Sequence, residues 1–324
     1  MKILKNAFLP ITIALVLTMA GCADGEQGES AKPIKDEKKA EVIPYEIQHA
    51  APQRIDQIYG LGYPGNDEGL YIASDDGMKI FSNGEWLESN SQKHEYTGFQ
   101  AVHDGFITSG HPQEGSDLKD PLGIVKSVDK GATLDHLAFD GELDFHFLSA
   151  GYQSNVMYII NNADSDALDP GVYSSDDLGA SWNPVKLKDF DADSLGMIAV
   201  HPTDDNLMAM ATRSGIYLSE DKGNHMKKIT DTIMVTAIAF SNDSLYYSSV
   251  ENNNVLFRSI NLDTMESASI DIPFLNYDNP ITYITVNQKN QQTIAFSTYL
   301  FDVYQSANNG GKWDLVMENG KIEE

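Results

Sequence analysis

Short apolar segments alternate with polar turns along most of the chain after residue 57. Six of them are small and aliphatic and open similar units, at 58–63, 98–102, 145–151, 196–200, 236–240 and 282–286. A polar turn follows in most units, and then a second apolar segment at 70–74, 157–161, 207–212, 245–250 or 293–298. Short apolar runs bounded by turn residues are typical of strands, and no long segment has the period of a helix. The pattern predicts an all-β protein.

A motif also recurs at regular intervals. Its fullest copy has serine, aspartate, glycine and tryptophan at 175, 177, 179 and 182. The copies at 127–134, 219–226 and 306–313 keep most of these residues, and shorter copies occur at 81–86 and 257–261. The six serines stand at 82, 127, 175, 219, 259 and 306, so successive copies are 40 to 48 residues apart. Such even spacing predicts a repeat architecture.

Each repeat has room for four strands, of which the third ends in the motif and the fourth leaves it. Four antiparallel strands in a repeat of this length are typical of a β-propeller blade. Six serines predict six blades, with seven as the alternative if 42–49 and 110–122 are more structured than expected. A blade alone cannot bury both of its faces, so the ring has to close. We expect 42–49, or the segment just after it, to add an edge strand to the last blade.

The motif resembles the Asp-box, or bacterial neuraminidase repeat, and the resemblance extends from about residue 55 to the C-terminus. Physically it is a hairpin turn. The carboxylate accepts backbone N–H groups, the serine hydroxyl ties back to it, glycine takes an angle that other residues resist, and the aromatic ring packs under the sheet. The resemblance implies a structural role at the periphery for Ser127, Asp129, Gly131, Ser175, Asp177, Gly179, Trp182, Ser219, Asp221, Gly223, Ser306, Gly310 and Trp313.

The N-terminus has the features of a secretory leader. Two lysines precede a charge-free apolar run at 7–19, which is too short to span a membrane. The run ends in Met19-Ala20-Gly21-Cys22, which resembles the lipobox of bacterial lipoproteins, and this cysteine is the only one in the chain. We expect a signal peptide at 1–21, an acylated Cys22 with a flexible tether at 22–41, and one propeller domain at 42–324. The protein would be a monomer, lipid-anchored in the cell membrane and facing the extracytoplasmic side.

Charge and composition exclude several classes of function. The chain has 22 lysine and arginine residues against 48 acidic ones, a net charge of -26. A surface this acidic repels phosphate backbones and anionic lipid headgroups. We therefore expect no nucleic-acid partner, and membrane contact through the lipid anchor only. No phosphate-binding glycine loop or nucleophile elbow occurs, and we expect no cofactor.

Several short sequence segments, taken together with the leader, resemble those of a family of bacterial lipoproteins. This family is labelled glycosyl-hydrolase-like and is distantly similar to the sortilin propeller. The segments lie at 110–112, 121–127, 144–146, 199–202 and 302–306. The resemblance implies a propeller, but glycosidase chemistry only by analogy, because one fold hosts many functions. A sialidase would also need an arginine triad, and no motif places Arg54, Arg213 and Arg258 together on inner strands.

Candidate chemistry is sparse. Other glycosidases need two carboxylates about 5–10 Å apart, and the best-placed acids are Asp144, Asp67, Glu68 and Asp302. Asp144 and His146 alternate on one side of a predicted strand and, with His111, would suit a metal or a general base. No His-x-His or His-x-x-x-His spacing supports a metal, so we expect none. We take His111, Asp144, His146 and Arg213 as the candidates for ligand binding.

Two functions from different classes remain. The first is a non-catalytic, surface-tethered scaffold that binds a protein or glycan at the cell envelope through its axial face and the loops 109–122 and 161–170. The second is a glycoside hydrolase that acts on envelope or extracellular polysaccharide with a carboxylate pair. The lining of the central channel separates them, because converging acids and aromatic residues favour an enzyme and polar, uncharged walls favour a binder.

Overall fold

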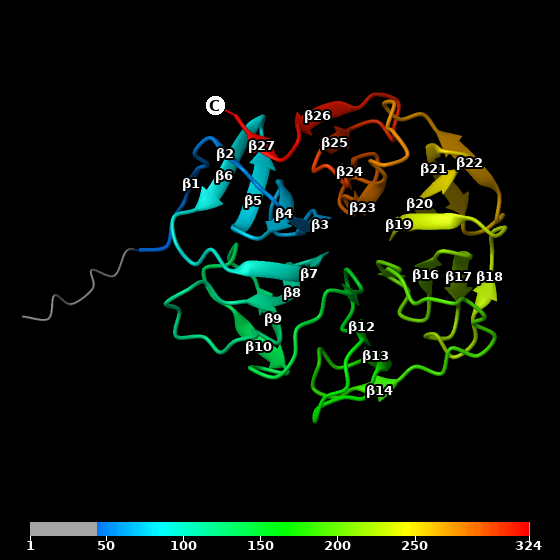
Figure 1. The fold of residues 1–324 in the computed structure, drawn as a ribbon, viewed down its shortest axis with the longest axis horizontal. Coiled ribbons are helices and arrows are strands. Elements are labelled where there is room, and N and C mark those ends of the chain that lie inside the picture. Colours follow the sequence, from blue (N-terminus) through cyan, green and yellow to red (C-terminus); the bar gives the residue numbers. More distant parts are fainter. Residues whose placement is uncertain (1–43, 324) are drawn as a thin grey trace, which may run out of the picture. The chain divides into compact units, whose positions relative to one another are not determined.

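The computed structural model describes residues 44–323, so the predictions for the signal peptide, Cys22 and the tether lie outside the described residues. Within this range the chain forms strands and turns and no helix. No helix of the described part is long and apolar enough to cross a membrane. Six antiparallel sheets stand around a common axis (Figure 1). The chain is a six-bladed β-propeller.

Each blade has four strands that follow one another from the axis to the rim. The first strands line the axis and are β3 (Ile58–Gly62), β7 (Glu95–Val102), β11 (Leu148–Ala150), β15 (Ile198–Val200), β19 (Met234–Phe240) and β23 (Ile281–Val286). The second strands are β4 (Leu70–Ser74), β8 (Gly105–His111), β12 (Met157–Asn161), β16 (Met208–Thr212), β20 (Ser244–Glu251) and β24 (Ile294–Thr298). The third strands are β5 (Gly77–Ser82), β9 (Ile124–Ser127), β13 (Gly171–Ser175), β17 (Gly215–Ser219), β21 (Asn254–Asn261) and β25 (Val303–Ser306). The fourth strands are β6 (Glu85–Ser89), β10 (Asp135–Ala138), β14 (Asn183–Pro184), β18 (Lys227–Lys228), β22 (Ser267–Ile270) and β26 (Asp314–Met317).

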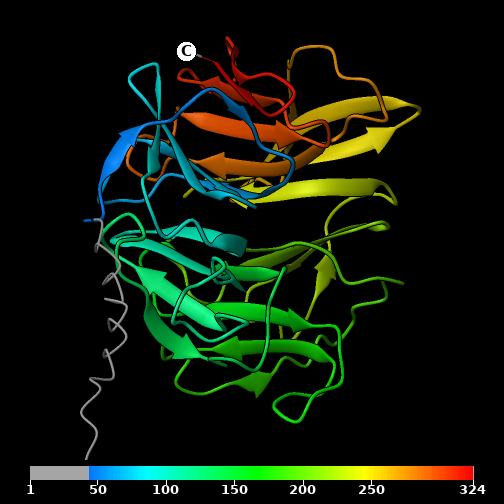
Figure 2. The ribbon, with the colours of Figure 1, turned by 60° about the vertical axis from the view of Figure 1, so that its left-hand side comes forward.

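Because neighbouring strands are antiparallel, the connections between them lie on two opposite faces of the ring (Figure 2). We call one the loop face. It carries the connections from second to third strands and those from each blade to the next. The turn face carries the connections from first to second and from third to fourth strands. The long segments 112–123 and 162–170 join second to third strands, so both lie on the loop face.

The core is divided among the interfaces between blades. Six apolar clusters fill it, and each combines residues of two adjacent blades. The second strands β4, β12, β16 and β24 are buried at every position. A strand covered on both faces needs apolar or small side chains throughout, which explains why the sequence shows runs there instead of alternation.

Four turns between third and fourth strands share one hydrogen-bond pattern. In the fullest, the buried Ser175 hydroxyl donates to Asp177 Oδ1 (2.8 Å) and accepts the N–H of Gly179 (2.8 Å). Asp177 Oδ1 also accepts the N–H of Ser181 (2.9 Å). The glycine has φ of 86°, which favours a residue without a side chain. The turns at Ser127, Ser219 and Ser306 repeat these bonds, with Asn308 in place of aspartate in the last.

The tryptophans of two of these turns pack against aromatic rings. The Trp182 ring lies 5.8 Å from Phe139, in the connection from the preceding blade. The Trp313 ring lies 4.7 Å from Phe296, and its indole N–H donates to the carbonyl of Asp271 (2.8 Å). The turns therefore stabilise the rim of the ring, away from the axis.

One predicted copy of the motif is wrong. Ser259 lies inside β21, paired with Tyr246 and Ala268, and not at a turn. The turn of this blade comes later, at 262–266, where Asn261 Oδ1 accepts the N–H groups of Asp263 (3.1 Å) and Thr264 (2.9 Å). An asparagine acceptor at the strand end replaces the serine here, so the spacing of serines alone misplaces the turn.

The ring closes differently from the prediction. β1 (Ile47–His49) adds to β6 of the first blade, not to the last blade, because Asn90 holds the backbone at Pro44 and Glu46. The segment just after it does reach the other end of the chain, since β2 (Gln53–Arg54) pairs with β27 (Lys321–Ile322) (Figure 1). The alternative of seven blades is wrong, because neither segment named for it forms a further blade.

The buried hydroxyl of the fullest turn gives a test of its structural role. Ser175→Ala is expected to lower the free energy of unfolding by about 1–3 kcal/mol, because the N–H of Gly179 loses its acceptor in a buried position. Urea denaturation measures the loss. Ser181→Ala, at an exposed position of the same turn, is the control and should stay within about 1 kcal/mol of the wild type. Equal losses would show that burial of the serine contributes nothing.

Candidate functional site

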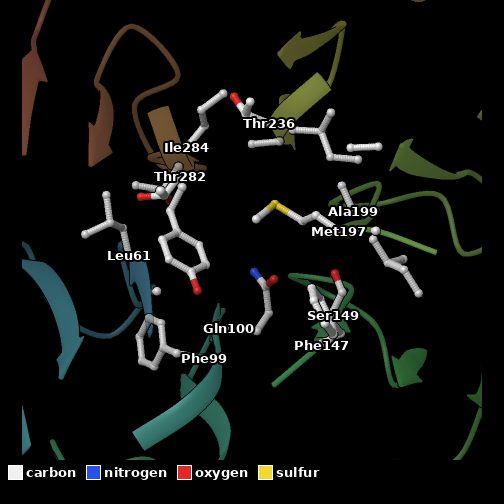
Figure 3. Close-up of a pocket in the computed structure, with 18 of the residues that line it drawn as sticks. Leu61, Phe99, Gln100, Phe147, Ser149, Met197, Ala199, Thr236, Thr282 and Ile284 are labelled. Carbon is white, nitrogen blue, oxygen red and sulfur yellow. The ribbon is translucent and has the colours of Figure 1, made fainter. Parts of the chain in front are cut away.

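The axis of the propeller holds a cavity of about 980 Å³. All six first strands contribute to its wall, so residues far apart in the chain face one another across it (Figure 3). Among those labelled there are Leu61, Phe99, Gln100, Met197 and Thr236. A cavity of this size can enclose most of a small organic molecule.

The chemistry of the cavity wall contrasts with that of the whole chain. No aspartate or glutamate is among its lining residues, although the chain carries 48 acidic residues. Aromatic and aliphatic side chains predominate, with a few neutral polar ones such as Gln100, Ser149 and Thr282 (Figure 3). Besides tyrosines, the ionisable groups in the wall are His146 and Arg213.

Exposed apolar side chains gather at one mouth of this cavity. Ten large apolar residues of the described part are exposed, and seven of them lie on the loop face: Phe147, Leu195, Met234, Phe274, Tyr277, Tyr299 and Leu300. Five of these seven also line the cavity. The segments 271–280 and 299–302 are joined by hydrogen bonds, Tyr299 N–H to Pro280 O (2.9 Å) and Leu300 N–H to Asn279 Oδ1 (2.7 Å). We call the five residues that line the cavity, Phe147, Leu195, Met234, Tyr299 and Leu300, the apolar rim. Exposed apolar patches of this kind often mark interaction sites.

Three of the predicted site residues meet beside this mouth. The mostly buried Asp144 accepts hydrogen bonds at Oδ1 from Thr97 (2.6 Å) and Ser109 (2.9 Å). Its other oxygen lies 3.3 Å from Nε2 of His146 and 3.9 Å from Nε2 of His111. Asp144 and His146 lie in the connection before β11 and not within a strand as predicted, yet their side chains still approach each other.

Further contacts orient the groups around Asp144. His111 Nδ1 lies 2.6 Å from Asp120 Oδ1. Partial burial opposes protonation, but the bond to Asp120 and the charge of Asp144 outweigh it and raise the pKa of His111 above its ordinary value. Tyr59 donates to Glu95 (2.6 Å), and burial together with this carboxylate raises the pKa of Tyr59, so its hydroxyl stays protonated. Within residues 44–323 no group of three or more histidine, cysteine or acidic side chains is arranged to hold a metal.

The remaining catalytic candidates do not join this group. Asp67 lies on the turn face and pairs with Lys130 and Tyr71, and Glu68 beside it pairs with Lys289 of the last blade. Asp302 accepts hydrogen bonds from the backbone of Asn319 (2.9 Å) and the side chain of Asn279 (3.2 Å). None of the three lines the cavity.

Comparison with known proteins agrees with this architecture. No family model matches the chain, and no curated protein sequence matches it. Among solved structures, the GH74 enzyme of Niastella koreensis matches with a TM-score of 0.53 and 16% identity, over 83% of this chain and 46% of that one. The GH74 xyloglucanase from Xanthomonas campestris matches with a TM-score of 0.52 and 14% identity, over 84% of this chain and 47% of that one. YCF48 bound to D1 peptide matches with a TM-score of 0.48 and 11% identity, over 85% of this chain and 86% of that one.

These likenesses show the fold alone. The chain spans less than half the length of either GH74 enzyme. Whether the propeller is catalytic is therefore a question for its own residues.

The sequence does not single out the apolar rim. Leu195, Met234 and Leu300 look like ordinary apolar residues near loops when each repeat is considered alone. Phe147, Leu195 and Met234 do share one signal, which is their position near the start of a predicted first strand. Aligning the six repeats at their first strands would bring these residues to one end of the channel.

Proposed function

We propose that this protein is a non-catalytic binding scaffold, anchored through acylated Cys22 on the extracytoplasmic side of the cell membrane, that binds its protein or small-molecule partner at the loop face. The observation that carries the proposal is the apolar rim around a cavity whose wall contains no carboxylate. The long loops 112–123 and 162–170 lie on the same face and enlarge the surface available to a partner. Fatty-acid labelling tests the anchor: the wild type should carry label and Cys22→Ser should not.

A plug in the cavity tests the proposed binding site. The probe is the neutral dye N-phenyl-1-naphthylamine, whose fluorescence rises in apolar surroundings. Thr236→Trp places an indole in the wall at β19 and is expected to weaken dye binding at least about tenfold, because the cavity loses the space the dye needs. Leu315→Trp, on the outer strand β26, is the control and should bind like the wild type. Unchanged binding by the plugged variant would contradict the proposal.

The alternative function, glycoside hydrolysis, has less support from the residues. A carboxylate pair would have to reach a sugar, and none of the candidate acids lines the cavity. Asp144 lies beside the cavity-lining His146. One of its oxygens already accepts two hydroxyl hydrogen bonds, and the other faces two imidazoles. A panel of fluorogenic glycosides is expected to give no turnover above buffer. Turnover that Asp144→Asn abolishes would establish the alternative.

A further inference from the structure

One cation in the cavity wall has no partner within the described part of the chain. Arg213 lies in the hairpin between β16 and β17, on the loop face, and lines the cavity. The other two arginines each pair with a carboxylate, Arg54 with Asp56 (3.7 Å) and Arg258 with Glu251 (2.5 Å). No acidic side chain of residues 44–323 lies within 4.0 Å of a nitrogen of Arg213. Arg213 is exposed on the loop face, so its guanidinium is available to a ligand.

The surroundings of Arg213 restrict the kind of ligand. The wall offers neutral donors and acceptors, such as Gln100, Ser149 and Thr282, and no carboxylate that would repel an anion. Exposed acids such as Asp193, Asp231 and Asp278 stand outside the wall, in the connections that lead to first strands. Together with the net charge of -26, they disfavour ligands with several negative charges. A ligand with a single anionic group on an otherwise apolar body fits the apolar wall and the guanidinium. It also avoids the repulsion that several negative charges would meet.

We propose that the cavity binds an organic anion with one carboxylate or sulfonate attached to an aromatic or aliphatic body. Arg213 binds the anionic group, since a guanidinium offers several N–H donors in one plane. The aromatic and aliphatic wall encloses the body, for which about 980 Å³ leaves room. This inference rests on the proposed function, because it specifies what enters the same cavity. A small organic acid and the C-terminal carboxylate of an apolar peptide share this chemistry.

Two dyes that differ in one group test the inference. 8-Anilinonaphthalene-1-sulfonate is N-phenyl-1-naphthylamine with a sulfonate added. The wild type is expected to bind the sulfonate about tenfold more tightly than the neutral dye, as a charge-assisted hydrogen bond would give. Arg213→Gln should remove this difference, and Arg213→Lys should restore part of it. Arg213 is exposed, so these variants are expected to fold.

The outcomes separate the two proposals. Equal affinity for the two dyes in the wild type, or an unchanged preference in Arg213→Gln, would overturn the inference and leave the binding site intact. Failure of both dyes to bind would instead contradict the proposed function. Displacement of the sulfonate dye by naphthalene-2-carboxylate supports a small organic acid. Displacement by an apolar peptide with a free C-terminus, but not by its amide, supports a peptide end, and displacement by the amide as well would overturn the role of the anion.

Discussion

Replacing Glu88 by glutamine is expected to lower the free energy of unfolding by about 3–5 kcal/mol. Lys79 is fully buried in β5, and its ammonium lies 2.6 Å from the carboxylate of Glu88 on the adjacent strand β6. Glutamine keeps the shape of the side chain and removes its charge, so Lys79 would keep only the half-exposed Asp76 as a counter-ion. A buried charge that loses its partner is strongly destabilising. Urea denaturation at neutral pH measures the effect.

The same pair predicts a pH dependence. Burial alone would raise the pKa of Glu88, but hydrogen bonds from Lys79 and Lys93 outweigh it and lower the pKa from 4.5 to about 2. A lowered pKa contributes stability in full above 4.5 and loses it as the pH falls toward 2. The wild type should therefore lose stability in this window more steeply than Glu88→Gln.

A double variant is the control for the buried pair. Lys79→Met with Glu88→Leu removes both charges and should recover most of the stability that Glu88→Gln loses, because no buried charge is left alone. If Glu88→Gln itself stays within about 1 kcal/mol of the wild type, the account of this pair is wrong.

Gly98→Ala is expected to destabilise the propeller by about 3 kcal/mol or more. Gly98 lies where the register of β7 shifts, between Thr97 and Gln100, and has φ of 46°. A Cβ atom at this position would also overlap the carbonyl oxygen of Phe145, in the segment that enters the next blade. The variant should thus displace the neighbouring Asp144 as well as strain β7. Thermal unfolding measures the loss of stability.

Gly84 offers a matched control for this prediction. It too has a positive φ, 84°, but a Cβ atom added there would meet nothing within 4 Å. Gly84→Ala therefore adds only the backbone strain, about 1–2 kcal/mol. If the two variants lost the same stability, the close approach of Gly98 to Phe145 would contribute nothing to it.

Much of the fold can be predicted from local patterns in the chain. The apolar runs 70–74 and 157–161 have the same bounds as β4 and β12, because a strand covered by both neighbouring blades is apolar throughout. The segment 145–151 predicts a strand longer than β11. The Phe145 N–H bonds to the side chain of Ser109 in the neighbouring blade (3.0 Å), an interaction with no local signal. The pairing of β1 with β6 is likewise long-range, and the sequence assigns it to the wrong blade.

The candidate site is less predictable because it also depends on contacts between residues far apart in the chain. Spacing brings Asp144 and His146 together, but the contact of His111 with Asp120 depends on a loop that returns on itself. Nothing in the sequence indicates that the wall of the channel would lack acids in so acidic a chain. Arg213 stands out as a binding residue only because no carboxylate of residues 44–323 lies near it. That absence is a property of the assembled ring and cannot be seen in the sequence.

The most direct test of the account is a crystal structure of the full protein grown with N-phenyl-1-naphthylamine. The account predicts density for the dye inside the ring, between Thr236 of β19 and Thr282 of β23 on one side and Phe99 of β7 on the other. Density for the dye only on the turn face or the outer strands, with none in the central cavity, would contradict the claim that this cavity is the binding site.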